Sequence, residues 1–125
     1  MTPEQEAFNK IWDWFIVQGK PAGLEPNTDG ACKLRTSDGK CCAVGLLIPD
    51  DEYEVSLESC GVDPETLIFR VPALNGLGAL FLADIQAAHD AAAYKVVDFH
   101  KRITERLTDI ARRSGFTIPT TQATA

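Results

Sequence analysis

Cysteines are the residues of this chain with the most chemical options, and they stand at Cys32, Cys41, Cys42 and Cys60. An even number is compatible with disulfides, a zinc site or a reactive thiol. If Asp38-Gly39 is a two-residue turn, Cys32 and Cys41 lie about 13 Å apart along one face, whereas disulfides need Cα atoms within about 7 Å. Neighbouring residues on a strand point to opposite faces, so the Cys41-Cys42 pair is poorly placed to chelate one ion. We therefore expect reduced, metal-free, buried thiols and no cofactor.

The two histidines offer little catalytic chemistry at their spacing. His89-Asp90 is similar to the metal-binding pair of phosphohydrolases, but such sites need further ligands, and His100 is the only other histidine. Histidine could activate a thiol, yet nothing in the sequence brings Cys41 or Cys42 to either ring. The GxGxxG, GxxxxGK[ST], HExxH and GxSxG motifs do not occur. We therefore predict no catalytic residues and no metal ligands, with a thiol- or zinc-dependent enzyme as an alternative.

Seven carboxylates without a cation occupy residues 50–65, the acidic segment: Asp50, Asp51, Glu52, Glu54, Glu58, Asp63 and Glu65. Their order lacks the alternating ligands, central Gly and closing Glu of a calcium loop. Like charges at this density repel one another and destabilise the fold unless basic groups offset them. Two arrangements meet this need. The acidic segment either faces a basic partner, or it docks on the C-terminal helix near Lys101, Arg102 and Arg106.

The elements that must position these groups are mostly helical. Apolar residues at helical spacing predict three main helices, over residues 3–18, 74–88 and about 91–114. A short helix begins at Asp63-Pro64. The stripes of the main helices predict one core that contains Trp12, Phe15, Leu77, Phe81, Ile103 and Leu107.

Asp38-Gly39 between two short segments predicts a β-hairpin. Residues 40–44 return as a second short strand or turn directly into a helix. An isolated hairpin is marginally stable, so it must lean on the helices. The predicted fold class is α+β and mostly helical, with three main helices, one small β-hairpin and one or two short helical turns. We expect one compact domain over residues 1–118 and a flexible tail over residues 119–125.

Size and charge restrict the classes of function. The chain has 125 residues, 12 Lys and Arg against 18 Asp and Glu, and a net charge of −6. Direct nucleic-acid binding is not expected, because neutralising phosphates needs a basic surface. No run of about 18 apolar residues occurs, so no membrane span is expected. The first ten residues are polar and acidic, unlike a signal or transit peptide, which predicts a cytoplasmic protein.

A longer motif begins at the cysteines. It comprises Cys32-Lys-Leu-Arg, Asp38-Gly39-Lys40-Cys41, then Cys42-Ala-Val-Gly-Leu-Leu-Ile-Pro-Asp50 and Tyr53, followed later by Leu82-Ala-Asp-Ile-Gln-Ala-Ala-His89-Asp90. This pattern resembles a family of small phage and prophage proteins. The sequence departs from it at Leu34, where an aromatic residue is usual, and by its second cysteine, so that the family position falls on Cys41 or Cys42. The resemblance implies a phage context, with the host cytosol as the location, but no reaction.

Together these observations favour a small phage-encoded protein that acts non-catalytically on a host protein, for example as an inhibitor of an antiviral defence system. An alternative is sequestration of a small anionic ligand such as a nucleotide by basic residues of the C-terminal helix such as Arg102, Arg106 and Arg113. The oligomeric state stays open.

Trp14 lies about 120° from the apolar stripe of its helix, so it packs on a second neighbour or anchors a partner. The residues that we expect to bind the partner are Trp14, Arg35, Asp38, Lys40, Asp50, Asp51, Glu52, Tyr53 and Glu54.

Overall fold

The computed structural model describes residues 2–24, 33–60, 63–93 and 98–119, and 66% of the structure is helical. Three long helices form its body: α1 (Pro3–Trp12), α4 (Ala79–Ala93) and α5 (Phe99–Ser114). A π-helical turn, η1 (Asp13–Val17), continues α1. The remaining helices are short: α2 (Ala43–Leu46), η2 (Asp50–Glu52), η3 (Val55–Cys60), α3 (Pro64–Arg70) and η4 (Pro72–Leu74).

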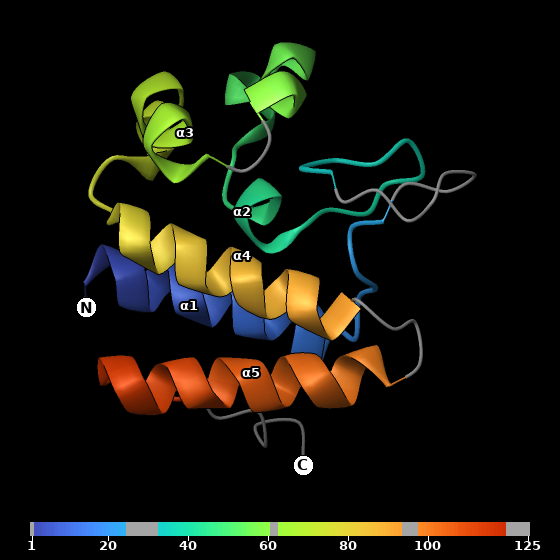
Figure 1. Ribbon diagram of the computed structural model, residues 1–125, viewed down its shortest axis with the longest axis vertical. Coiled ribbons are helices and arrows are strands. Elements are labelled where there is room, and N and C mark those ends of the chain that lie inside the picture. The colour runs from blue at the N-terminus through green and yellow to red at the C-terminus, as the bar shows by residue number, and fades with distance from the viewer. Residues whose placement is uncertain (1, 25–32, 61–62, 94–97, 120–125) are drawn as a thin grey trace.

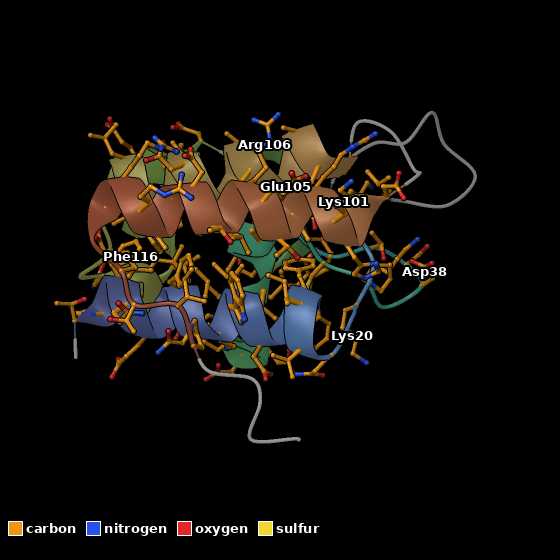
Figure 2. All side chains as sticks on the ribbon, turned by 90° about the horizontal axis from the view of Figure 1, so that it is seen from below. Lys20, Asp38, Lys101, Glu105, Arg106 and Phe116 are labelled. Atoms are coloured by element: carbon orange, nitrogen blue, oxygen red, sulfur yellow. The ribbon has the colours of Figure 1, made fainter. Side chains whose placement is uncertain are left out.

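The long helices lie side by side, and the short ones cover one side of them. In Figure 1, α5 lies at the bottom, α1 and α4 lie above it, and α2, α3 and η3 are at the top. Phe116, after α5, packs on Phe8 of α1 and Phe81 of α4 with ring centroids 5.3 and 5.6 Å apart (Figure 2). The C-terminal end of the described chain is thereby tied to both other long helices.

The predicted β-hairpin is wrong, because the described residues contain no β-strand. An isolated antiparallel bridge joins Arg35 to Cys41. The turn between them is longer than the predicted two residues, since the Thr36 N–H donates to the Lys40 carbonyl at 2.9 Å. Gly39 supplies the left-handed conformation, with φ +87°. The chain then turns directly into α2, which was the other predicted course for residues 40–44.

Two helix boundaries also differ from the prediction. The central helix starts at Ala79 instead of Leu74, because Gly76 has φ +94° and interrupts the helical path. It then continues through the His89-Asp90 pair to Ala93. The last helix starts at Phe99 instead of Ala91, directly after Asp98, whose φ is +63°. Apart from residue 119, the predicted tail lies outside the described residues.

Other local predictions are confirmed. Thr2 Oγ1 accepts a hydrogen bond from the Gln5 N–H at 3.0 Å and so caps α1, and α3 begins at Pro64. The predicted core is present as well. Five of its six members are buried, while Leu77 packs against the core and is half-buried. Phe15, His89 and Phe99 meet where η1, α4 and α5 converge, with centroids 5.6 to 6.0 Å apart.

Candidate binding groove

Two glycines allow the backbone to cross itself around the Cys-rich motif. A Cβ on Gly45 would overlap the carbonyl group of Leu34, and a Cβ on Gly23 would overlap the backbone between Cys41 and Cys42. The backbone segments therefore approach more closely than any side chain permits. These crossings hold residues 34–42 against α2 and the chain that follows η1.

The His89-Asp90 pair belongs to a buried hydrogen-bond network. The Gly23 N–H donates to His89 Nε2 at 3.0 Å, so the proton of the neutral ring lies on Nδ1, which faces Asp90 Oδ1 at 3.0 Å. Gln86 donates to the same carboxylate at 2.8 Å and accepts from the Val44 N–H at 3.2 Å. His89 is fully buried. His89 and Gln86 therefore fix the backbone at residues 23 and 44.

Within the described ranges, no group of three His, Cys, Asp or Glu residues could hold a metal ion. His89 in particular uses both ring nitrogens within the protein. The similarity of His89-Asp90 to a phosphohydrolase pair is therefore limited to the sequence.

Arg35 organises the start of the acidic segment. Its guanidinium donates to the Ile48 carbonyl at 2.7 Å and pairs with Asp50 at 2.8 Å. The same guanidinium lies 4.5 Å from the centroid of the Tyr53 ring, a cation–π geometry. Arg35 thus orients the turn that leads from α2 into η2.

Glu58 fixes the other side of this arrangement. Its carboxylate accepts hydrogen bonds from the N–H groups of Leu34 and Arg35 at 2.9 and 3.0 Å, and from the Tyr53 hydroxyl at 2.6 Å. Burial, together with the bond to Glu58, raises the pKa of Tyr53 to about 12. Through this hydrogen bond to Glu58, Tyr53 links the end of η2 to η3.

The acidic segment does not dock on the C-terminal helix. Figure 1 places η2 and η3 on the opposite side of α1 and α4 from α5. Its carboxylates instead meet groups nearby: Glu54 lies 3.5 Å from Arg70, and Glu52 accepts from the Ala73 N–H at 2.8 Å. Arg35, Arg70 and backbone amides therefore offset part of its charge.

A groove of about 590 Å³ opens between the α1–η1 helix and residues 35–50. Trp14 and the positively charged Lys10, Arg35 and Lys40 line it, together with the carboxylates of Asp13 and Asp50. Four of the nine predicted binding residues thus share one site: Trp14, Arg35, Lys40 and Asp50. Asp38 pairs with Lys40 at 3.1 Å but does not line the groove, nor do Asp51, Glu52, Tyr53 and Glu54.

The sequence reasoning missed Lys10 and Asp13 as groove residues. Lys10 precedes Trp14 by four residues, so helical spacing places both on one face. That signal could have found Lys10 once Trp14 was selected.

Trp14 forms an aromatic wall of this groove. The residue is half-buried and packs against the core, while its indole N–H is buried without an acceptor in the described structure. The Lys20 ammonium lies 5.3 Å from the ring centroid. Trp14 sits in a π-helical turn, an irregularity that frequently occurs at functional sites. Trp14 therefore packs on neighbouring residues, as one of the two predictions stated, and also presents part of its ring to the groove.

Cys41 and Cys42 are poorly suited to thiol chemistry. Burial raises the pKa of Cys41, which lines the groove, to about 11, although Arg35 and Lys10 act in the opposite direction. Burial raises the pKa of Cys42 to about 12, even though its sulfur accepts from the Gly45 N–H at 3.3 Å. Both thiols are therefore protonated at neutral pH, whereas nucleophilic attack and metal binding require the thiolate.

Cys41 and Cys42 are free cysteines, and both are buried. The predictions for Cys32 and for the Cys60 side chain lie outside the described part of the chain.

Comparisons with protein-family models, with curated proteins and with solved structures gave no match to this chain. Among the helices of the described ranges, none is long and apolar enough to cross a membrane.

Proposed function

We propose that this chain is a non-catalytic, phage-encoded binding protein that occupies a host protein through the groove between α1–η1 and residues 35–50. The observation that carries the proposal is the position of Trp14, which borders this groove with Lys10, Arg35 and Lys40. Trp and Arg dominate the binding energy of many protein interfaces. A component of an antiviral defence system is the kind of target that the resemblance to phage proteins suggests.

The chemistry of the surrounding residues supports binding over catalysis. Cys41 and Cys42 are protonated at neutral pH because burial raises the pKa of each thiol. His89 is buried and hydrogen-bonded at both ring nitrogens. Cys42 and His89 each accept a backbone hydrogen bond, which gives both residues a structural role.

Charge reversal in the groove tests this function. The immobilised protein is exposed to bacterial lysate as wild type, as Lys10→Glu with Lys40→Glu, and as the control Lys101→Glu with Arg106→Glu. The control pair is exposed on α5 (Figure 2). We expect the groove variant to capture at least about tenfold less of a host protein than the wild type, equivalent to about 1.4 kcal/mol. The control variant should capture as much as the wild type. Equal capture by all three proteins would contradict the proposal, provided that their melting temperatures agree.

A second candidate, sequestration of a nucleotide, is favoured by the three cations beside the aromatic face of Trp14. Of the α5 residues expected to bind it, Arg102, Arg106 and Arg113, the last pairs with Asp109 at 2.9 Å, whereas Lys10, Arg35 and Lys40 line the groove beside Trp14. Thermal melting with added ATP separates the candidates, since a ligand that binds the native state raises the melting temperature. A rise that Lys10→Glu with Lys40→Glu abolishes would favour the nucleotide over the host protein.

A further inference from the structure

Two large apolar side chains project into solvent from η3 and α3, the short helices that overlap and follow the acidic segment. Phe69 on α3 is 89% exposed and Val55 on η3 is 79% exposed. The preceding residues of α3 turn inward, because Leu67 is fully buried and Ile68 packs against the core. Successive helical residues are rotated by about 100°, so Phe69 faces away from the body of the protein. Neither side chain contributes to the core.

A hydrogen-bonded link from Arg70 brings the two elements together. The Arg70 guanidinium donates to Ser56 Oγ at 2.8 Å and lies 3.5 Å from the Glu54 carboxylate. Phe69 precedes Arg70 in the chain, and Val55 lies between the two residues that Arg70 reaches. Figure 1 shows α3 and η3 together at the end of the molecule opposite α5. Phe69 and Val55 are therefore direct chain neighbours of the residues that form this contact between α3 and η3.

The surroundings of this apolar pair are acidic. From residue 41 to residue 94 the sequence contains nine Asp and Glu residues and a single Arg, Arg70. The Glu54 side chain is 72% exposed, and Asp51, Asp63 and Glu65 are exposed as well. An anionic membrane, or a second copy that docks through this same surface, would meet it with the same sign of charge, which is unfavourable.

We propose that Phe69 and Val55 form a second contact surface, separate from the groove, for a protein that presents an apolar pocket bordered by Lys and Arg. The apolar side chains enter the pocket, and Glu54, Asp63 and Glu65 meet the basic border. Such an arrangement removes two exposed apolar groups from water. It also places the exposed carboxylates of Glu54, Asp63 and Glu65 opposite positive charge.

Site-specific photo-crosslinking tests this surface. p-Benzoylphenylalanine replaces Phe69 in the full chain, and a second protein carries it at Leu80, which is 82% exposed on α4 and serves as the matched control. Both proteins are irradiated in bacterial lysate, and the adducts are identified by peptide mass spectrometry. The position-69 protein is also tested with Glu54→Lys and Glu65→Lys and at high salt, which screens charge attraction between exposed groups.

We expect an adduct with a bacterial protein from position 69 that is absent from position 80. The adduct should fall at least about tenfold in the Glu54→Lys, Glu65→Lys background, equivalent to about 1.4 kcal/mol. Its attachment site should lie beside Lys or Arg residues of the partner. No adduct, an adduct with a second copy of this chain, equal adducts from both positions or an adduct insensitive to charge would each overturn the proposal. Melting temperatures establish that every variant is folded.

Discussion

At the scale of single residues, the motif cysteines and glycines shape the backbone. The Cys42 sulfur caps α2, and the missing side chain of Gly45 lets the Leu34 backbone pack against it. Gly39 adopts the positive φ of the turn that precedes α2. Each role depends on the small size or the special geometry of the residue. These positions of the motif are therefore ones that the fold requires.

Substitution at Gly45 should be far more destabilising than at Gly39. Alanine at Gly45 introduces a Cβ into the Leu34 carbonyl group, whereas a Cβ at Gly39 meets nothing within 4 Å. We expect Gly45→Ala to lower the free energy of unfolding by about 3 kcal/mol or more. Gly39→Ala should cost about 1–2 kcal/mol, from its positive φ alone. Urea denaturation measures both, and similar losses would show that the crossing at Gly45 relaxes readily.

The buried thiols should resist alkylation and respond to alkaline pH. At pH 7.5, iodoacetamide should modify Cys41 and Cys42 much more slowly in the native protein than in guanidinium chloride, as read by peptide mapping. The native pKa of Cys41 is raised from 9.0 to about 11, so the folded state holds this proton more tightly. Its contribution to stability is present below pH 9 and is lost as the pH rises towards 11. Rapid native alkylation of Cys42 would contradict its burial.

At the scale of elements, α4 is the centre of the molecule. It packs against α5, α2 and α3, and its buried residues include Phe81, Leu82, Ile85 and His89. Most of its surface is covered by other elements, so its apolar residues are not confined to one face and its amphipathic pattern is weak. The prediction of burial therefore holds for Phe81, Leu82 and Ile85 but not for Leu80, which is 82% exposed, and the predicted first residue differs by five positions.

Neighbouring residues of α4 should differ sharply on truncation. Phe81 is only 7% exposed and its ring contacts Phe116, whereas Leu80 is 82% exposed. We expect Phe81→Ala to cost about 3–5 kcal/mol and Leu80→Ala to change stability by no more than about 0.5 kcal/mol. Chemical denaturation of the two variants provides the comparison. A loss below about 1 kcal/mol for Phe81→Ala would mean that α4 is not central to the core.

At the scale of the whole molecule, charge is distributed unevenly between two sides. The short helices carry the acidic segment, while α5 carries exposed Lys101, Arg106, Arg112 and Arg113 on the far side of α1 and α4. Interactions between exposed charges weaken beyond a Debye length of about 10 Å at 0.1 M salt. The acidic segment therefore interacts with Arg35 and Arg70 rather than with the basic helix.

Double-mutant cycles should separate these interactions. Asp50 pairs with Arg35 at 2.8 Å, although its side chain is 96% exposed, so alanine substitutions should reveal a coupling of about 0.2–1 kcal/mol that salt reduces. The cycle of Asp50 with Arg106 of α5 should give a coupling indistinguishable from zero. A larger coupling for Arg106 than for Arg35 would show that the acidic segment docks on α5 in solution.

The sequence by itself determined the features that depend on neighbouring residues. The Thr2 cap, the start of α3 at Pro64 and the core residues of the long helices follow from spacing over a few positions. The mostly helical character follows in the same way. These predictions succeeded because caps, prolines and apolar periodicity act within one or two turns.

Only the tertiary structure decided what joins distant segments. The sequence alone could not show that Lys10 and Trp14 face Arg35 and Lys40 across a groove, or that His89 receives the N–H of Gly23. It also predicted a hairpin where residues 40–46 form a turn and α2, because the Leu34–Gly45 crossing and the Gln86–Val44 bond favour the helical course. Such contacts depend on packing between residues 11 to 66 positions apart, and no local pattern encodes which of them will form.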